Sequence, residues 1–395
     1  MSARPAAPRL LVDCGHTIAG AQYSGIQRYV RHTLRQAAHL LGTDRVGAIG
    51  AAADGSWREL AAMPAHPMEG LGPLRLHTTG TRAVHFDANS HVLLADRLWH
   101  LGRHDALDQL LRSPARITLV VYDLLSLSSA QWFAPGVGER FGRYLRDVLP
   151  RAQQIVCLSH AVRHDLHDWA AAQGLRIAGI DVVAPGHRVW EGTPETPAAL
   201  PAGWRGGSHP FVLQVGTIEP RKNHAQTLAA LRRHWDSGSR MGLLFIGQRG
   251  WLMEPFMDAM AQLPQWQREL IWLSECTDAQ LDWCYRHAAA VFYPSANEGY
   301  GLPLAEAASV GTPVIASDTA VHREVVRQLA GRGEAVRLCE PSAENLDALL
   351  AQALTRPAAP RGTGGRGWRE ATADLLNAMK LPAQHGLNSR LLQFR

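Results

Sequence analysis

Short apolar runs alternate with amphipathic segments along most of the chain. The first run, Arg9–Asp13, predicts a strand; a loop then spans Gly15–Gly25, and an amphipathic helix follows at about Ile26–Leu41. Later in this half the same pattern predicts strands at 84–87, 91–94, 117–122, 154–159 and 180–184. A helix follows 154–159, and strands that alternate with helices indicate parallel βαβ layering.

A second series of the same kind begins after a break rich in proline and glycine at 192–207. It predicts a helix at 225–235, a C-terminal helix at 368–379, and strands at 210–216, 241–247, 269–273, 289–293 and 314–317. The two series predict an α/β protein with two Rossmann-like domains, 1–200 and 201–395, with the final helix free to pack back on the first domain. One large α/β domain is the alternative, and the linker and the length of 395 residues disfavour it.

The most specific motif is Glu298-Gly-Tyr-Gly-Leu-Pro-Leu-Ala-Glu306, directly after the strand predicted at 289–293. Gly299 and Gly301 give a flexible loop, and Pro303 is favoured in the first turn of a helix. Free amides and the positive end of the helix dipole make such a helix start suitable for an anion, here a diphosphate. Without the intervening residues, the two glutamates would be an ordinary surface pair.

A basic turn follows the first strand of the second half. Gly216 and Thr217 leave that strand, and Arg221 and Lys222 come shortly afterwards. Arginine offers a fork of donors and lysine a point charge, which suit phosphate oxygens. A solvated basic turn is the alternative; the position at the carboxyl end of a strand favours phosphate binding.

Other candidates stand at predicted strand ends. Gly247 and Ser274 follow two strands of the second half, where backbone groups would contact a nucleotide. In the first half, Gly25 precedes the first long helix, and Asp123 follows the strand at 117–122. The alternative role for Asp123 is to cap a helix, and the same alternative holds for Ser159. Arg28 is equally compatible with a polar helix face.

The motif at 298–306, together with Val310-Gly-Thr-Pro-Val-Ile-Ala316, resembles the paired-glutamate signature of family-four retaining glycosyltransferases. The segment 24–30 resembles the corresponding part of bacterial polysaccharide mannosyltransferases. The likeness is strong over 211–326, moderate over 10–186 and weak after 340. It implies the glycosyltransferase B-type fold, in which an acceptor-binding domain faces a nucleotide-sugar-binding domain across a cleft.

The resemblance also implies a reaction. A hexose would pass with retention from a nucleoside-diphosphate sugar, GDP-mannose being the best guess, to a saccharide or lipid-linked acceptor in bacterial surface polysaccharide or lipopolysaccharide synthesis. Glu298 would contact the transferred sugar, Lys222 and Arg221 would stabilise the leaving diphosphate, and Asp123 would orient sugar or acceptor. The implied donor-binding residues are Gly25, Gly216, Thr217, Gly247, Ser274, Gly299, Tyr300, Gly301, Leu302 and Glu306, the last on the ribose. Thr217 stands where many members carry arginine, and Tyr122 where many carry histidine.

No cofactor and no metal are expected, because the sequence holds no Asp-x-Asp triplet and its five cysteines lack metal-ligand spacing. Two other functions stay open: a sugar-nucleotide epimerase of the same fold, and a non-catalytic nucleotide-sugar-binding subunit. Purified protein that hydrolyses a nucleotide sugar would exclude the binding subunit.

Composition adds little to this interpretation. Hydrophobic residues make up 46% and charged residues 19%, which is ordinary globular composition. The net charge of +5 permits an anionic ligand or membrane surface without demanding one, and no nucleic-acid partner is expected. No leader-like segment and no apolar run of about 20 residues is present. We therefore expect a cytoplasmic protein, with peripheral contact to the inner membrane left open.

Overall fold

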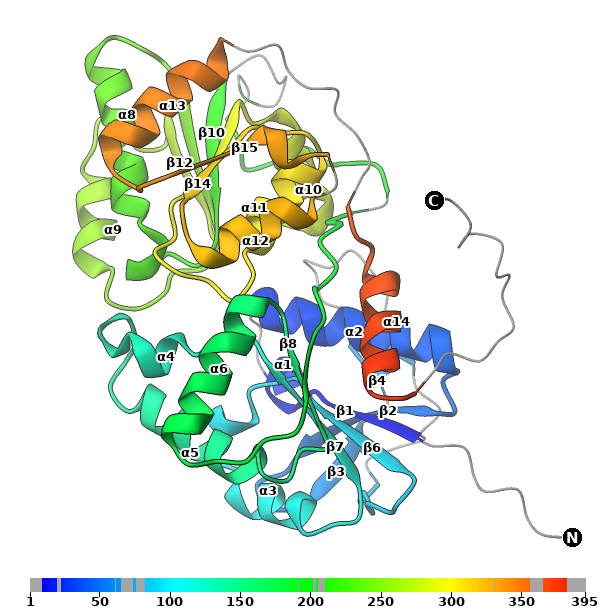
Figure 1. Cartoon of the computed structure of the whole chain (residues 1–395). Helices are drawn as coiled ribbons and strands as arrows, with labels where there is room; N and C mark the ends of the chain where they lie inside the picture. The colour runs from blue at the N-terminus through cyan, green and yellow to red at the C-terminus, as the bar shows by residue number, and fades with distance from the viewer. Residues whose placement is uncertain are drawn as a thin grey trace, which may run out of the picture.

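The computed structural model describes residues 9–19, 23–60, 62–64, 74–75, 82–190, 192–201, 204, 210–329, 331–355 and 365–381. Within these residues the chain forms two α/β domains, one above the other in Figure 1. Each domain has its own sheet, so the predicted α/β class with two parallel-sheet domains is confirmed. The limits 1–200 and 201–395 stay a prediction.

The first domain contains a seven-stranded sheet with the order β3-β2-β1-β6-β7-β8-β9. All neighbours in it are parallel except the β2–β3 pair at one edge. Its strands are β1 (Arg9–Asp13), β2 (Val46–Ala51), β3 (Trp57–Leu60), β6 (Ser90–Leu94), β7 (Arg116–Val121), β8 (Gln154–Cys157) and β9 (Ile180–Val182). Two short strands, β4 (Ala62–Met63) and β5 (Leu74–Arg75), pair separately.

The helices of this domain connect successive strands and cover the sheet (Figure 1). They are α1 (Gly15–Ala19), α2 (Gly25–Leu41), α3 (His104–Leu111), α4 (Leu125–Ser128), α5 (Val137–Val148) and α6 (His160–Ala172), with 3-10 turns η1 (Leu98–His100) and η2 (Ala130–Trp132). Ser159 begins α6 because its side chain accepts a hydrogen bond from the Val162 amide.

The second domain contains a six-stranded parallel sheet with the order β12-β11-β10-β13-β14-β15. Its strands are β10 (Phe211–Val215), β11 (Gly242–Ile246), β12 (Leu270–Leu273), β13 (Ala290–Tyr293), β14 (Val314–Ser317) and β15 (Val336–Cys339). Three of the central strands, β11, β13 and β14, are buried at every position. Such continuous apolar runs are typical of parallel strands covered on both faces.

The helices of this domain lie on both sides of its sheet (Figure 1). They are α8 (His224–Asp236), α9 (Glu254–Ala261), α10 (Asp278–His287), α11 (Leu302–Ser309), α12 (Ala320–Gln328) and α13 (Ala343–Leu354), with 3-10 turns η3 (Pro220–Lys222) and η4 (Gly333–Ala335).

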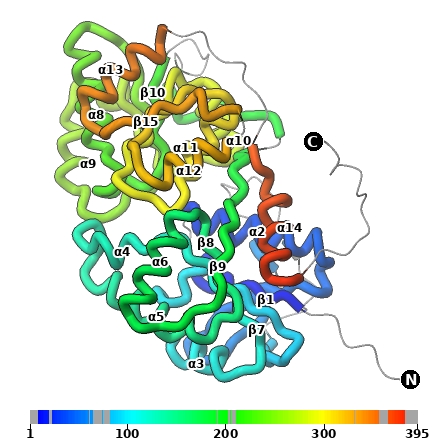
Figure 2. Tube along the Cα trace, in the orientation of Figure 1, coloured from blue at the N-terminus to red at the C-terminus, as the bar shows by residue number. Residues whose placement is uncertain are grey.

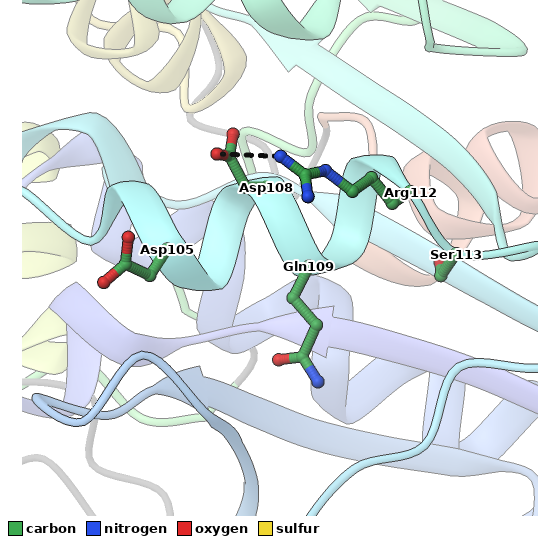
Figure 3. A pocket seen from close by; sticks show the side chains of 5 residues that line it. All are labelled: Asp105, Asp108, Gln109, Arg112 and Ser113. Atoms are coloured by element: carbon green, nitrogen blue, oxygen red, sulfur yellow. Dashed lines mark ion pairs between the residues drawn. The ribbon is translucent and has the colours of Figure 1, made fainter.

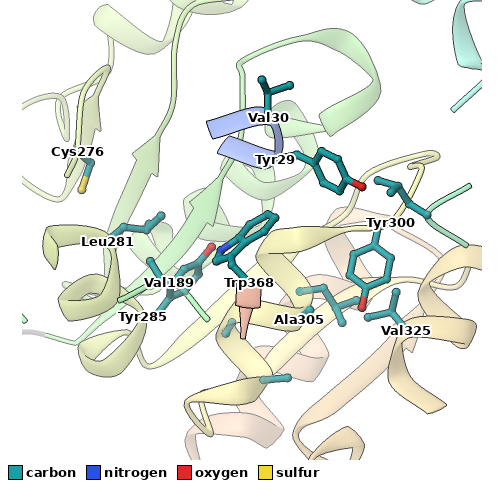
Figure 4. Close-up of a cluster of buried hydrophobic side chains, with 14 of the residues drawn as sticks. Tyr29, Val30, Val189, Cys276, Leu281, Tyr285, Tyr300, Ala305, Val325 and Trp368 are labelled. Carbon is teal, nitrogen blue, oxygen red and sulfur yellow. The ribbon is translucent and has the colours of Figure 1, made fainter. Parts of the chain in front are cut away.

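The last helix, α14 (Trp368–Ala378), leaves the second domain and packs beside α2 of the first, as Figures 1 and 2 show from one viewpoint. Trp368 fixes it there, because its ring stacks on His32 at 4.6 Å between centroids and meets Tyr29 edge-on at 6.2 Å. Figure 4 shows Trp368 within a cluster that also contains Tyr29 and Tyr285. Residues from both domains therefore share one hydrophobic core.

Most predicted elements are present, with some shorter than expected. The strand predicted at 84–87 is wrong: these residues form no strand, although the Val84 amide donates to the Trp57 carbonyl and Asp87 makes turn contacts with Ser90. The loop predicted at Gly15–Gly25 contains the short helix α1, and residues 20–22 lie outside the described residues. No helix among the described residues is long and apolar enough to cross a membrane.

Candidate active site

The predicted site residues gather where the carboxyl ends of both sheets meet at the domain boundary. Asp123 follows β7 in the first domain, while Lys222 follows β10 and Glu298 follows β13 in the second. Because β10 and β13 are neighbours, the loops after them leave the sheet side by side. Open parallel sheets place their ligands at this edge.

Glu298 is the centre of a buried charge cluster. Its Oε1 lies 2.5 Å from the Lys222 Nζ and its Oε2 lies 3.0 Å from an Arg221 NH1. Arg221 also pairs with Glu219 at 2.7 Å. Glu298 is 8% exposed and Lys222 is 7% exposed, so these charges are largely removed from water. The predicted phosphate-binding cations and the predicted sugar-binding carboxylate are thus brought together.

The cluster carries its charges in the ligand-free protein. Burial alone would raise the pKa of Glu298, but Arg221 and Lys222 outweigh burial and hold that pKa below its ordinary value. For Lys222 burial is the larger effect and lowers the pKa of the amine, although Glu298 opposes it. Glu298 is therefore ionised, and it pairs with the same two cations, Arg221 and Lys222, that a diphosphate would need.

The loop after Glu298 touches the first domain so closely that only glycine fits. A Cβ on Gly299 would lie 1.9 Å from the Tyr122 carbonyl oxygen. The Gly299 carbonyl also accepts a hydrogen bond of 2.9 Å from the Ser159 hydroxyl. Ser159 therefore caps its own helix and also ties the Glu298 loop to the first domain.

Asp123 lies in the same electrostatic field. Its Oδ1 accepts a hydrogen bond of 3.0 Å from the Leu125 amide, so it does cap the turn at α4. Burial raises the pKa of Asp123, while Arg221 and Lys222 lower it and Glu298 raises it further. Capping therefore does not remove Asp123 from the cluster of charges.

Helix α11 begins with the conformation that its motif predicts. Gly301 has φ of 96°, in the left-handed region that favours glycine, and Pro303 lies in the first turn. A Cβ on Gly25 would lie 3.6 Å from a Leu302 methyl carbon, so the start of α2 faces the start of α11. Gly25 and Leu302 are thus adjacent across the domain boundary.

Glu306 is paired with a residue from the opposite domain. An NH1 of Arg28 lies 2.6 Å from its Oε1, and the Tyr285 hydroxyl donates to its Oε2 at 2.7 Å. Glu306 is 1% exposed. Arg28 also approaches Asp278, with 3.6 Å between Nε and Oδ1. Burial opposes the charge on Arg28, but Glu306 and Asp278 raise its pKa well above the ordinary value.

Some predicted donor-binding residues lie outside these contacts. The Tyr300 side chain enters the hydrophobic cluster of Figure 4, where its hydroxyl reaches Gln328 at 3.4 Å. Ser274 is exposed, and its carbonyl accepts from the Gln248 amide at 2.8 Å. The Gly247 carbonyl accepts from the Trp272 indole at 2.8 Å. The contacts of these three residues therefore lie within the second domain.

The basic turn itself is compact. A Cβ on Gly216 would lie 3.4 Å from the Lys222 Cε, so the glycine leaves room for the lysine side chain, and Thr217 is partly exposed on the same turn. Together these residues place one buried amine beside Glu298.

Several residues near the site were not singled out from the sequence. His322, on α12, is fully buried and lies 3.4 Å from the position of a Cβ on Gly301. Its Nδ1 bonds to the Ser317 carbonyl at 2.7 Å, and its Nε2 has no partner among the described residues. Burial lowers its pKa, so the ring is neutral. His322 stands in no motif that would have marked it beforehand, whereas Glu219 lies within the basic turn at 216–222 but was not itself singled out.

One surface hollow lies away from the charge cluster. A cavity of about 520 Å³ runs along α3, and Figure 3 shows its exposed lining, including the Asp108–Arg112 pair. None of the predicted site residues lines it. In the part of the chain that the structure describes, no group of three or more histidine, cysteine, aspartate or glutamate side chains is placed to hold a metal ion.

Comparisons with known proteins find a family match within the second domain. Residues 205–364 match the model of the glycosyl transferases group 1 family. The serotype-specific mannosyltransferase WbdA of Escherichia coli is 31% identical over 238 residues, which cover 57% of this chain and 28% of WbdA. The O-antigen chain mannosyltransferase B of E. coli is 32% identical over 191 residues, 45% of this chain and 46% of that protein. The chain thus spans less than half the length of either relative.

The fold extends beyond the part that the family model matches. The solved structure of Anabaena Alr3699/HepE in complex with UDP and glucose superposes with a TM-score of 0.59, at 13% identity, over 95% of this chain and 97% of that one. The chain therefore has the B-type fold of glycosyltransferases. The stretch of its second domain that matches the group 1 glycosyl transferase model contains Lys222, Glu298 and Glu306.

Proposed function

We propose that the protein is a retaining, metal-independent glycosyltransferase that moves a hexose from a nucleoside-diphosphate sugar to a saccharide or lipid-linked acceptor. The observation that carries the proposal is the Glu298–Lys222–Arg221 cluster at the start of α11. It combines buried cations with a helix N-terminus, the two features that stabilise a diphosphate. The family match of the same domain supports this chemistry.

The cluster would act at the moment when the bond between sugar and diphosphate breaks. Negative charge then grows on the leaving oxygen, and Lys222 and Arg221 are already in place to stabilise it. Positive charge develops on the sugar ring at the same time, and the Glu298 carboxylate, freed from one or both cations by the diphosphate, would face it. Asp123 would hold the transferred sugar or the acceptor hydroxyl from the first domain.

GDP-mannose is the donor that we propose, since two relatives bear the name of mannosyltransferases. The names of those relatives also support an acceptor in surface polysaccharide synthesis. Glu306 would bind the ribose hydroxyls, which requires the Arg28 contact to open or to be shared. A lipid-linked acceptor would bring the protein to the inner membrane, where its net charge of +5 favours contact with anionic lipid.

Purified protein should be incubated with GDP-mannose, GDP-fucose, UDP-glucose and UDP-N-acetylglucosamine, with and without manno-oligosaccharides. We expect nucleotide release from GDP-mannose, an α-linked product by NMR, and no loss of activity with EDTA. A changed sugar with the nucleotide still attached would instead indicate an epimerase. Donor binding without any turnover would indicate a non-catalytic subunit, and loss with EDTA that manganese restores would contradict metal independence.

A further inference from the structure

An apolar group lies on the surface where loops of the two domains meet. It consists of Trp132 and Phe133 from the first domain and Trp251 and Leu252 from the second. Trp251 is 37% exposed and Leu252 is 57% exposed, whereas Trp132 and Phe133 are partly buried. Together the four residues form a small apolar patch, which is more informative than a single exposed apolar side chain.

The two loops hold each other in place. The Trp251 indole donates a hydrogen bond of 2.5 Å to the Trp132 carbonyl. The rings of Phe133 and Trp251 lie 6.0 Å apart between centroids and are inclined at 31°. The indole N–H is therefore satisfied by the other domain, while part of the side chain stays open to solvent.

Short, stiff segments connect this group to the charge cluster. Gly250 donates to the Ile218 carbonyl at 3.0 Å, and Ile218 donates to the Gln248 carbonyl at 2.9 Å. Ile218 directly precedes Glu219, the partner of Arg221. In the first domain, Asp123 leads into α4, and η2 then ends at Trp132. The loop of the second domain is therefore hydrogen-bonded to the turn that carries the partner of Arg221, and the loop of the first domain follows Asp123.

The backbone beside Trp251 is unusual. Leu252 has φ of 58°, in the left-handed region that a bulky side chain rarely adopts. Such conformations persist where the surroundings impose them, and they concentrate at functional sites. Leu252 thus presents an exposed apolar side chain next to the partly exposed indole of Trp251.

We propose that Trp251 and Phe133 form a subsite for a pyranose ring of the saccharide acceptor, an inference that rests on the proposed function. One face of a pyranose is made of C–H groups and packs on a flat aromatic ring, while the hydroxyls around its edge stay hydrated. Indole supplies a large rigid apolar surface at low entropic cost. The donor would occupy the region of Lys222, Gly301 and Glu306, so the surface beyond Asp123 is left for the acceptor.

The test compares Trp251→Ala, Trp251→Phe and Leu354→Ala, a matched control because Leu354 is 43% exposed on α13. GDP-mannose serves as donor and α-linked mannobiose as acceptor. We expect Trp251→Ala to raise the acceptor KM about tenfold, far more than the donor KM, as loss of an aromatic contact does. Trp251→Phe should retain most of the affinity, and Leu354→Ala should match the wild type.

Saturation-transfer NMR with mannobiose and the 395-residue chain tests the subsite without turnover. Saccharide contact that Trp251→Ala abolishes supports the inference even if the wild type releases no nucleotide, in which case only the proposed function fails. Nucleotide release without Trp251-dependent saccharide contact overturns the inference alone. Equal increases of both KM values in Trp251→Ala would mean that Trp251 only joins the domains, which would overturn the inference. The inference is also overturned if Trp251→Ala loses binding to phosphatidylglycerol vesicles but keeps its saccharide contact, because Trp251 would then contact a membrane.

Discussion

Lys222 is one of only two lysines in the chain, and it is the one that is buried beside Glu298. We expect Lys222→Ala to lower turnover about a hundredfold or more, because one preorganised donor to the leaving diphosphate is lost. Lys380→Ala removes the other, exposed lysine and should leave the kinetics unchanged. Circular dichroism of both variants establishes that the fold is intact. Near-normal turnover of Lys222→Ala would contradict the phosphate role.

The charge of Lys222 depends on Glu298, and this dependence predicts a pH effect. Burial lowers the pKa of Lys222 and Glu298 raises it, so Glu298→Gln should lower that pKa further. The amine then loses its proton at a lower pH, and the alkaline decline of kcat/KM for the donor moves the same way. Selective ¹³C-lysine labelling gives one signal for each lysine, and the signal missing from Lys222→Arg reports the pKa. An unchanged pKa in Glu298→Gln would contradict the coupling.

The lowered pKa of Lys222 also predicts how the stability of the fold changes with pH. A lysine whose pKa is lower in the folded than in the unfolded state makes the free energy of unfolding rise with pH between those two values. Glu298 has a dependence of the same sign, because its pKa is also lowered in the folded state: the stability that it gives is present above the ordinary carboxyl range and is lost on acidification through the folded pKa.

Replacing each of the two glutamates of the motif should change a different kinetic constant. Glu306 would bind ribose before and during the reaction, so Glu306→Gln should mainly raise the donor KM, as loss of uniform binding does. Glu298 would face charge that develops only during transfer, so Glu298→Gln should mainly lower kcat. Steady-state kinetics with one donor compares them. The assignment fails if both variants show the same rise in KM and an unchanged kcat.

At the scale of the elements, the loop that leads into α11 depends on a glycine. Gly299→Ala would place a methyl group 1.9 Å from the Tyr122 carbonyl oxygen, so the loop or β7 must shift. We expect kcat/KM to fall at least tenfold, since small displacements of reacting groups are costly. Gly179→Ala is the control, because no atom lies within 4 Å of its added Cβ. Equal kinetics of the two variants would show that the close approach does not matter.

The elements that the sequence predicted well are those with a strong local pattern. Strands β11, β13 and β14 are continuous apolar runs, and two glycines and a proline mark the start of α11. Strand β2 reads Val-Gly-Ala-Ile-Gly-Ala and was missed, because glycine and alanine have low strand propensity and the strand forms only through its neighbours β1 and β3. The run at 84–87 has strand-like residues but lacks a partner strand along its length.

The site residues likewise fall into those that a local motif predicted and those that it did not. Lys222 and Glu298 were found because each stands in a short motif at a strand end, and the parallel sheet brings such ends together. The sequence did not decide whether Arg28 belongs to a polar helix face or has a functional role, because its partner Glu306 is 278 positions away along the chain. His322 carries no local signal at all. Contacts between distant segments depend on how the two domains pack, which periodicity does not report.

For the molecule as a whole, three of the polar contacts between the domains involve buried or partly buried side chains close to the site. Ser159 bonds to Gly299, Arg28 pairs with Glu306, and Glu324 of α12 accepts from the His160 and Ala161 amides at the start of α6. A carboxylate at a helix N-terminus is favourable. Two of these contacts include residues of the 298–306 motif, so donor binding and the packing of the domains are physically linked.

The Arg28–Glu306 pair allows this link to be measured by a double-mutant cycle. Either single variant, Arg28→Gln or Glu306→Gln, leaves a buried charge without its main partner and should cost about 3–5 kcal/mol of unfolding free energy. The double variant removes both charges and should cost clearly less than the sum. Asp108 and Arg112 form an exposed pair at 3.7 Å on α3, and the same cycle there should give a coupling of about 0–1 kcal/mol. Urea unfolding of all the variants measures these free energies. If the losses of unfolding free energy at Arg28 and Glu306 are additive, the two charges do not depend on each other and this pair does not hold the domains together.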